Sequence, residues 1–198
     1  MEKKMFCYQC QETAGNKGCI LKGVCGKDFS TANLMDLLVF NLKGIAIIMT
    51  SMRRAGVKAD YRKADKAIME SLFATITNAN FDYSSIAKRV EKTFALKAEL
   101  YSLAFTQGIE LPENEAVTMQ GKPEEYDRLA LSVGILRETD EDVRSLKELT
   151  IYGLKGLAAY AEHADRLGYV DEEINAFTER ALHDVTMGLL SAEELTAL

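Results

Sequence analysis

The residues best suited to chemistry are four cysteines, and all of them lie within the first 25 of 198 residues. They are Cys7, Cys10, Cys19 and Cys25, with the spacing Cys-x2-Cys-x8-Cys-x5-Cys. Four glycines lie among and just after them: Gly15, Gly18, Gly23 and Gly26. Glycines allow a backbone to turn tightly and to point its N–H groups inward, toward metal-bound sulfurs. The pattern predicts a ligand loop that holds one metal centre.

Three occupants of this loop compete. Two disulfides are one, but we expect the chain to be cytoplasmic, and a reducing compartment disfavours them. Tetrahedral zinc accepts four thiolates, although structural zinc loops usually place roughly two to four residues between paired ligands, and here five residues separate Cys19 from Cys25. A 4Fe-4S cubane tolerates wider spacing because each thiolate binds a different iron. The spacing favours one iron-sulfur cluster and leaves zinc and disulfides as alternatives.

The composition argues against several other classes of protein. Hydrophobic residues make up 47% and charged residues 27% of the chain, which is typical of a soluble globular protein. The longest apolar run, Ile45 to Thr50, is far shorter than the roughly 20 residues of a transmembrane helix, so we expect no membrane span. The N-terminus lacks the long apolar segment of a signal peptide, which favours the cytoplasm. A net charge of −6 argues against a nucleic-acid partner.

Charge is distributed unevenly, with a net +3 in residues 1–27 and −9 in the rest of the chain. The positive residues of the first segment are Lys3, Lys4, Lys17, Lys22 and Lys27. These lysines could create a positive field that stabilises thiolates and an anionic metal centre. The alternative interpretation is that they are solvated surface residues with no role at the cysteines.

The body of the chain is predicted to be helical. Its two prolines, Pro112 and Pro123, fall in one polar stretch, and apolar residues elsewhere recur every three or four positions. The longest helix covers residues 31–55, with Ser30 or Thr31 as its N-cap and Gly56 at its C-terminal end. Its apolar stripe consists of Leu34, Leu37, Leu38, Leu42, Ile45 and Ile48. Further helices are expected at residues 64–77, 83–107 and 171–187.

An internal repeat organises these helices. Residues 34–56 align with residues 146–168 at an offset of 112, with eight identities in 23 positions, and a three-residue gap then aligns Glu70 with Glu179. Gly44 and Gly156 share one mid-helix position, where Gly costs ~1 kcal/mol relative to Ala, so we expect another backbone to approach each closely. The predicted fold class is all-α, with two helical bundles related by the repeat and preceded by an irregular Cys-rich loop.

The predicted organisation has four parts. Residues 1–29 form the Cys-rich iron-sulfur loop, residues 30–110 the first helical bundle and residues 111–140 a connecting segment. Residues 141–198 form the second helical bundle, which is expected to be incomplete because the second copy stops soon after its second helix.

Several motifs together resemble the hybrid cluster protein family, also called prismane proteins or hydroxylamine reductases. The motifs are MFCYQCQETAGNKGC and GVCGK at the N-terminus, LFATITNANFD (72–82), SVGIL (132–136) and EDVRSLKELTIYGLKGLAAYAEHA (141–164). The resemblance covers essentially the whole chain. It implies a helical N-terminal domain of two bundles and one 4Fe-4S cluster ligated by Cys7, Cys10, Cys19 and Cys25.

The resemblance also implies a separate active centre. In the family, reduction of hydroxylamine to ammonia and of nitric oxide to nitrous oxide is assigned to a hybrid iron-sulfur-oxygen cluster, ligated by His, Glu and Cys residues in two later α/β domains. No cysteine follows Cys25, so that ligand set is not in this sequence. His163 and His183 are lone histidines on predicted helices, and Glu162 is expected on a solvated helix face or cap. We assign no catalytic residue to this chain.

The leading hypothesis is the N-terminal electron-transfer domain of a hydroxylamine reductase, either as a fragment or as a naturally shortened relative. Its cluster would pass electrons from an external donor protein to the missing C-terminal α/β domains, and the chain alone would lack reductase activity. The alternative is a zinc-bound or metal-free helical interaction module on the same scaffold. We also expect apolar surface that faces the missing domains to favour self-association.

Overall fold

The computed structural model describes residues 5–10, 12, 13, 15, 17–76, 80–188 and 191–196. The helices are α1 (Phe29–Arg54), α2 (Arg62–Ala74), α3 (Tyr83–Thr106), α4 (Glu115–Thr118), α5 (Tyr126–Ala130), α6 (Glu141–Arg166), α7 (Glu172–Met187) and α8 (Ala192–Leu195). Short 3-10 helices lie at Pro123–Glu125 and Ile135–Arg137. Within the described ranges, the β pairing is limited to one isolated bridge between Cys7 and Cys19. The predicted all-α class is confirmed, and the described residues before α1 form an irregular loop.

The helix ends follow the sequence expectations to within a few residues. α1 begins directly after Asp28, whose carboxylate accepts a hydrogen bond from the Thr31 backbone N–H at 2.8 Å. The predicted N-cap, Ser30 or Thr31, was therefore wrong by two or three residues. Gly56 has a φ of 74°, the left-handed conformation expected just beyond the end of this helix. α2 ends at Ala74, so the helix predicted over residues 64–77 was wrong at residues 75 and 76, which are not helical; residue 77 lies outside the described residues.

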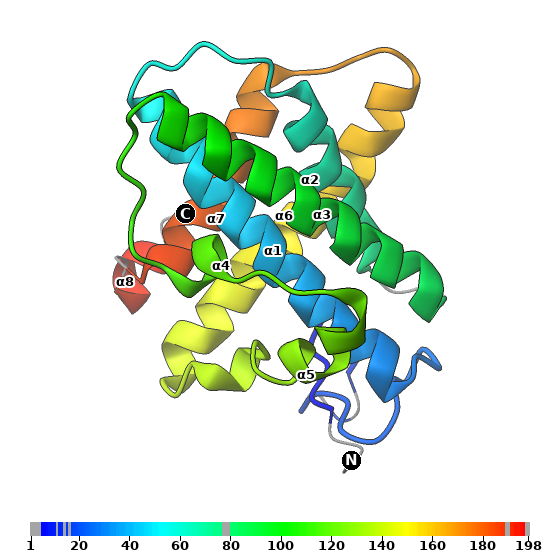
Figure 1. Ribbon diagram of the computed structural model, residues 1–198. Helices are drawn as coiled ribbons and strands as arrows, with labels where there is room; N and C mark the ends of the chain where they lie inside the picture. The colour runs from blue at the N-terminus through cyan, green and yellow to red at the C-terminus, as the bar shows by residue number, and fades with distance from the viewer. Residues whose placement is uncertain are drawn as a thin grey trace.

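α1 lies at the centre of the fold and is buried on nearly every side. The six residues of its predicted stripe are all buried, and so are twelve of its other residues. α3 packs along one side, and α4, α5 and α7 cover others (Figure 1). Contrary to the expectation from sequence, α1 is long and apolar enough to span a membrane, but 78% of its most apolar window is buried inside the fold. Its apolarity is that of a core helix.

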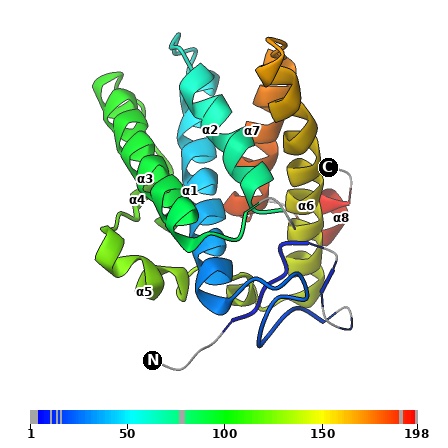
Figure 2. The same cartoon turned by 90° about the vertical axis from the view of Figure 1, so that its right-hand side faces the viewer.

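The two copies of the repeat interlock. α1 and α2 belong to the first copy, and α6 and α7 belong to the second. α1 packs on α7 and α2 packs on α6, so each long helix contacts the short helix of the other copy more than that of its own copy. Figure 2 shows these four helices side by side. The packing between the two copies is therefore reciprocal.

The two mid-helix glycines differ in their surroundings. A Cβ atom at Gly44 would lie 2.0 Å from the backbone oxygen of Ala116 in α4, so the close approach expected there is confirmed. At Gly156, no described heavy atom outside the local helix backbone lies within 4 Å of the corresponding place, and the expectation was wrong. The reason is that α3 and α4 pack over α1, whereas α6 is exposed at Gly156.

Both histidines and Glu162 lie on helices of the second copy of the repeat. His163 packs edge-on against the ring of Phe73, and the buried His183 places its Nδ1 2.6 Å from the carboxylate of Asp184. Glu162 is buried, contrary to the expectation of a solvated position, because α2 packs against α6 and removes it from water.

Candidate metal centre

Backbone pairing places two of the four cysteines opposite each other. The Cys7 N–H donates to the Cys19 carbonyl at 2.9 Å, and the Cys19 N–H donates to the Cys7 carbonyl at 3.0 Å. Both side chains are buried with Met5 and Ala32 in a small apolar cluster at the first turn of α1. Figure 2 shows the loop at the end of the bundle where α1 and α6 begin. One pair of thiols is therefore held on a fixed support.

The other two cysteines, Cys10 and Cys25, are partly buried, and all four are free thiols. The turn that carries Cys25 is closed by hydrogen bonds of 2.8 Å from the Gly23 N–H to the Lys27 carbonyl and from the Gly26 N–H to the Gly23 carbonyl. A Cβ atom at Gly23 would lie 3.0 Å from the Cys25 sulfur. A side chain at residue 23 would therefore crowd this thiol, and glycine leaves the thiol free space.

The donor set is made of four thiols, which both an iron-sulfur cluster and a zinc ion accept. In the described part of the chain, no three His, Cys, Asp or Glu side chains are arranged to hold one ion. Tetrahedral zinc requires four sulfurs at ~2.3 Å from one point, whereas the thiolates of a cubane bind different irons and stand farther apart. Cys7, Cys10, Cys19 and Cys25 are the four thiols of this glycine-lined loop that could hold such a centre.

The electrostatic surroundings of Cys7 favour its neutral form when no metal is bound. Burial raises the pKa of the Cys7 thiol to about 11. A hydrogen bond from the Gln9 backbone and the charges of Lys27 and Lys155 lower this pKa, while the charge of Asp36 raises it. At neutral pH the thiol is therefore protonated, and binding of a metal by its thiolate would release a proton.

Gln9, which lies between Cys7 and Cys10, ties the loop to a helix of each copy of the repeat. Its side-chain oxygen accepts a hydrogen bond from Lys155 Nζ in α6, and its side-chain amide donates to the carboxylate of Asp36 in α1. Lys155 Nζ also lies 3.4 Å from the Gln9 backbone oxygen. All three side chains are buried. We call Gln9, Asp36 and Lys155 the loop latch.

The loop latch contains two buried groups of opposite charge. Burial raises the pKa of Asp36 to about 7, and the charge of Glu148 adds to this effect. Burial lowers the pKa of Lys155 to about 8, against the attraction of Glu148 and Asp36. Lys43 and Glu148 line the same small cavity as the latch. One cavity beside Gln9 of the cysteine loop is therefore lined by two pairs of repeat-related residues, which are Asp36 with Glu148 and Lys43 with Lys155.

The sequence identified the four cysteines as candidates but not the loop latch. A signal was present in the repeat, because a carboxylate and a lysine recur at matching positions of two apolar helices. Among the lysines of the first segment, Lys27 is buried with its Nζ 2.9 Å from the Met35 sulfur, whereas Lys17 and Lys22 are exposed. Lys3 and Lys4 lie outside the described residues.

Comparison with known proteins identifies relatives of the chain. The model of the Prismane/CO dehydrogenase family matches residues 5–197. The chain is 99% identical over 198 residues to a hydroxylamine reductase from Porphyromonas gingivalis, a match that covers all of this chain and 36% of that protein. It is 49% identical over 197 residues to a hydroxylamine reductase from Desulfitobacterium hafniense and 48% identical over 194 residues to one from Bacteroides thetaiotaomicron. These two matches cover 98% of this chain and 36% and 35% of the relatives, so the chain spans about a third of their length.

Proposed function

Because the chain belongs to the Prismane/CO dehydrogenase family, we propose that it is the N-terminal electron-transfer part of a hydroxylamine reductase. Cys7, Cys10, Cys19 and Cys25 are proposed to hold one 4Fe-4S cluster. Such a centre, with a thiolate on each iron, takes up and releases one electron and offers no open position to a substrate.

The observation that carries the proposal is the loop with its four free thiols. Two backbone hydrogen bonds hold Cys7 and Cys19 face to face, and an apolar cluster fixes both on α1. The glycine-lined turn leaves room for Cys25, and Gln9 anchors the turn between Cys7 and Cys10. The chain thus offers four thiols on a loop that is anchored to the helical core, which supports the proposed ligand set.

The catalytic centre is proposed to lie in the rest of the longer protein. No cysteine follows Cys25, and His163 and His183 are each engaged with a neighbouring side chain. Reduction of hydroxylamine to ammonia, or of nitric oxide to nitrous oxide, is therefore proposed for a hybrid cluster in later α/β domains. In this proposal the present chain relays electrons in the cytoplasm from an external donor protein.

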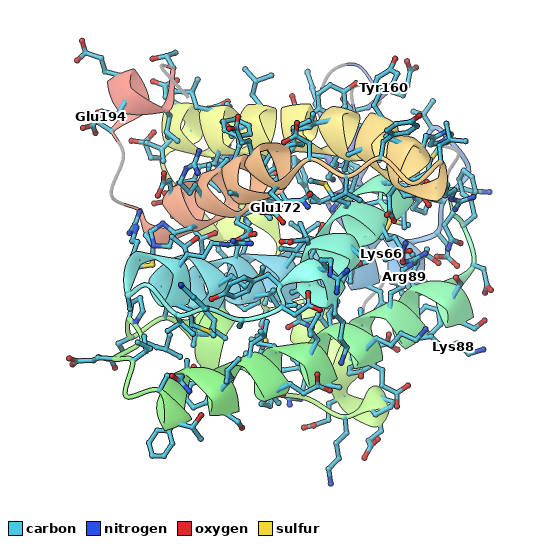
Figure 3. The ribbon with its side chains drawn as sticks, turned by 90° about the horizontal axis from the view of Figure 1, so that it is seen from above. Lys66, Lys88, Arg89, Tyr160, Glu172 and Glu194 are labelled. Atoms are coloured by element: carbon cyan, nitrogen blue, oxygen red, sulfur yellow. The ribbon has the colours of Figure 1, made fainter. Side chains whose placement is uncertain are left out.

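Exposed apolar side chains on α6 support a contact with those later domains. Leu149 and Tyr160 are 64% and 82% exposed, and Tyr160 points away from the helices (Figure 3). We propose that this face contacts the remainder of the longer protein. In the isolated chain, the same exposed surface is expected to favour self-association.

The substitution Cys19→Ser tests the ligand assignment. After anaerobic purification, the variant is expected to lose most of its iron and sulfide, because a serine hydroxyl is a poor replacement for a thiolate. Its far-ultraviolet circular dichroism is expected to stay helical, because a chain of this size builds its core without a metal. Ile20→Ser, at the exposed neighbouring residue, is the matched control and is expected to keep its iron.

Three results would contradict the proposal. Full iron content in Cys19→Ser would remove this residue from the ligand set. A colourless wild-type chain with one zinc would favour the alternative function, a zinc-bound helical interaction module. Turnover of hydroxylamine by the purified chain would contradict the placement of the catalytic centre in other domains.

A further inference from the structure

Lys155 brings a buried positive charge to the cysteine loop. It lies within α6 and is only 2% exposed. Its Nζ donates a hydrogen bond to the side-chain oxygen of Gln9 and lies 3.4 Å from the backbone oxygen of the same residue. Gln9 is two residues from Cys7 and one from Cys10. Because charges interact more strongly where water is excluded, this ammonium group acts on the loop far more than an exposed lysine does.

Asp36 brings the opposite charge to the same glutamine. Its carboxylate accepts a hydrogen bond from the Gln9 side-chain amide, and burial keeps it away from solvent. The two charged groups come from different copies of the repeat, Asp36 from α1 and Lys155 from α6. Gln9 therefore joins the loop to the place where the copies meet.

The repeat supplies an internal reference for Lys155. Lys43 is the equivalent residue of the first copy and lines the same cavity, yet it is only partly buried. Both residues belong to the same Leu-Lys-Gly motif. The difference between them is therefore one of surroundings and not of local sequence.

We propose that the loop latch positions the turn between Cys7 and Cys10, and that its charges set the reduction potential of the centre bound there. Lys155 raises the potential and Asp36 lowers it. This inference rests on the proposed function. Reduction adds one electron from a mediator, and no bond forms or breaks. The added negative charge is stabilised by the ammonium group and destabilised by the carboxylate, and buried charges of this kind are among the factors that tune iron-sulfur potentials.

A potentiometric titration followed by electron paramagnetic resonance, at pH 7.5, tests the part played by the charges. Lys155→Met is expected to weaken electron uptake about tenfold, equivalent to ~59 mV to lower potential for a one-electron couple. Asp36→Asn keeps a side-chain oxygen for Gln9 but removes the charge, so it is expected to shift the potential upward. Lys155→Arg keeps the charge and is expected to stay near the wild-type value. Lys43→Met is the matched control, with a smaller downward shift than Lys155→Met.

The direction of the two shifts separates charge from structure. Loss of packing alone would move the potentials of Lys155→Met and Asp36→Asn the same way, whereas the proposal requires opposite directions. Equal potentials in the wild type and both variants would overturn this part of the inference. A shift in Lys43→Met as large as that in Lys155→Met would also overturn it.

Hydrogen exchange in the metal-free chain tests the positioning part. Lys155→Met and Asp36→Leu each remove a bond to Gln9, so the amide hydrogens of Cys7 and Cys19 are expected to exchange about fivefold faster, as loss of one hydrogen bond predicts. Asp36→Asn keeps the bond and is the control. Unchanged exchange in both bond-deleting variants would overturn the positioning role.

The outcomes also separate this inference from the function on which it rests. A wild-type chain that binds a cluster, with variants whose potentials and exchange rates are unchanged, overturns the inference alone. A wild-type chain that binds no cluster under anaerobic reconstitution overturns the proposed function and the assignment of a potential to the latch together.

Discussion

The two copies of the Leu-Lys-Gly motif have the same sequence and the same helical conformation but different neighbours. In α1, Gly44 is covered by the backbone of Ala116, and Lys43 is partly buried. In α6, Gly156 faces open space, and Lys155 is buried against the cysteine loop. The first copy uses its glycine for close packing, and the second uses its lysine to hold the loop.

This difference shows what decides the role of a repeated residue. The repeat gives both copies a helix of the same length, so the motif occupies the same helical position in each. What packs over that position differs, since α3 and α4 cover α1 whereas the N-terminal loop reaches α6. Matched substitutions in the two copies therefore measure the effect of surroundings at constant local sequence.

The largest difference between the copies is expected at the paired glycines. Gly44→Ala places a Cβ atom 2.0 Å from the Ala116 oxygen and is expected to lower the free energy of unfolding by about 3 kcal/mol through overpacking. Gly156→Ala meets no described atom and is expected to raise it by ~1 kcal/mol, because alanine favours a helix interior. Urea unfolding followed by circular dichroism measures both. Equal stabilities of the two variants would contradict the comparison.

The next largest effect is expected at the paired glutamates. Glu179 is buried at 1% side-chain exposure and accepts two hydrogen bonds of 2.9 Å from the Arg53 guanidinium, which links the two copies. Its equivalent, Glu70, has a side chain that is 34% exposed and pairs at longer distances, 3.9 Å and 3.4 Å, with Lys66 and Arg89. Lys66 and Arg89 are labelled in Figure 3.

Glu179→Gln is expected to lower the free energy of unfolding by about 2 kcal/mol. This loss is smaller than that for a fully buried ion pair because Arg53 is partly exposed. Glu70→Gln is expected to cost less than about 0.5 kcal/mol, as is usual for exposed ion pairs. Thermal unfolding at equal ionic strength compares them. A loss at Glu70 as large as that at Glu179 would show that burial does not distinguish the two sites.

The last difference between the copies is a pH dependence that belongs to the first copy. Asp65 stands where the second copy has Ile174, and burial, followed by the neighbouring Glu179 carboxyl, raises the pKa of Asp65 to about 8. The folded chain therefore keeps a proton that the unfolded chain releases above the ordinary pKa of 3.8. The contribution of this raised pKa to the free energy of unfolding is fully present below about pH 4 and is lost as the pH rises toward 8.

Asp65→Asn removes this titration, so its free energy of unfolding is expected to fall less than that of the wild type between pH 5 and pH 8. The difference in slope is expected to be below about 1 kcal/mol per pH unit. Urea titrations of both proteins across this range measure it. A steeper fall in the variant than in the wild type would contradict the raised pKa.

The sequence predicted the parts of the fold that depend on local pattern. Apolar periodicity located the long helices, and the glycine after α1 marked its end because a left-handed residue is needed there. The cysteine spacing located the loop. The N-cap was missed because several residues before α1 can accept the same hydrogen bond, and Asp28 is the one that does.

The sequence did not reveal features that depend on which helices pack together. The periodicity of α1 indicated one apolar stripe, yet α1 is buried on most sides because helices of both copies surround it. Nothing in the local sequence distinguishes Glu162 from an exposed polar helix residue, and it is buried because α2 packs against α6. Likewise, contact between Gln9 and Lys155 joins residues 146 positions apart, and no local pattern specifies such a pair.

The most direct test of the account is analysis of iron, acid-labile sulfide and zinc in the anaerobically purified wild-type chain, with an electron paramagnetic resonance spectrum after reduction. The account predicts about four irons and four sulfides per chain and a signal from a one-electron-reduced cluster. A colourless protein with a single zinc, or with no metal after reconstitution with iron and sulfide, would contradict it.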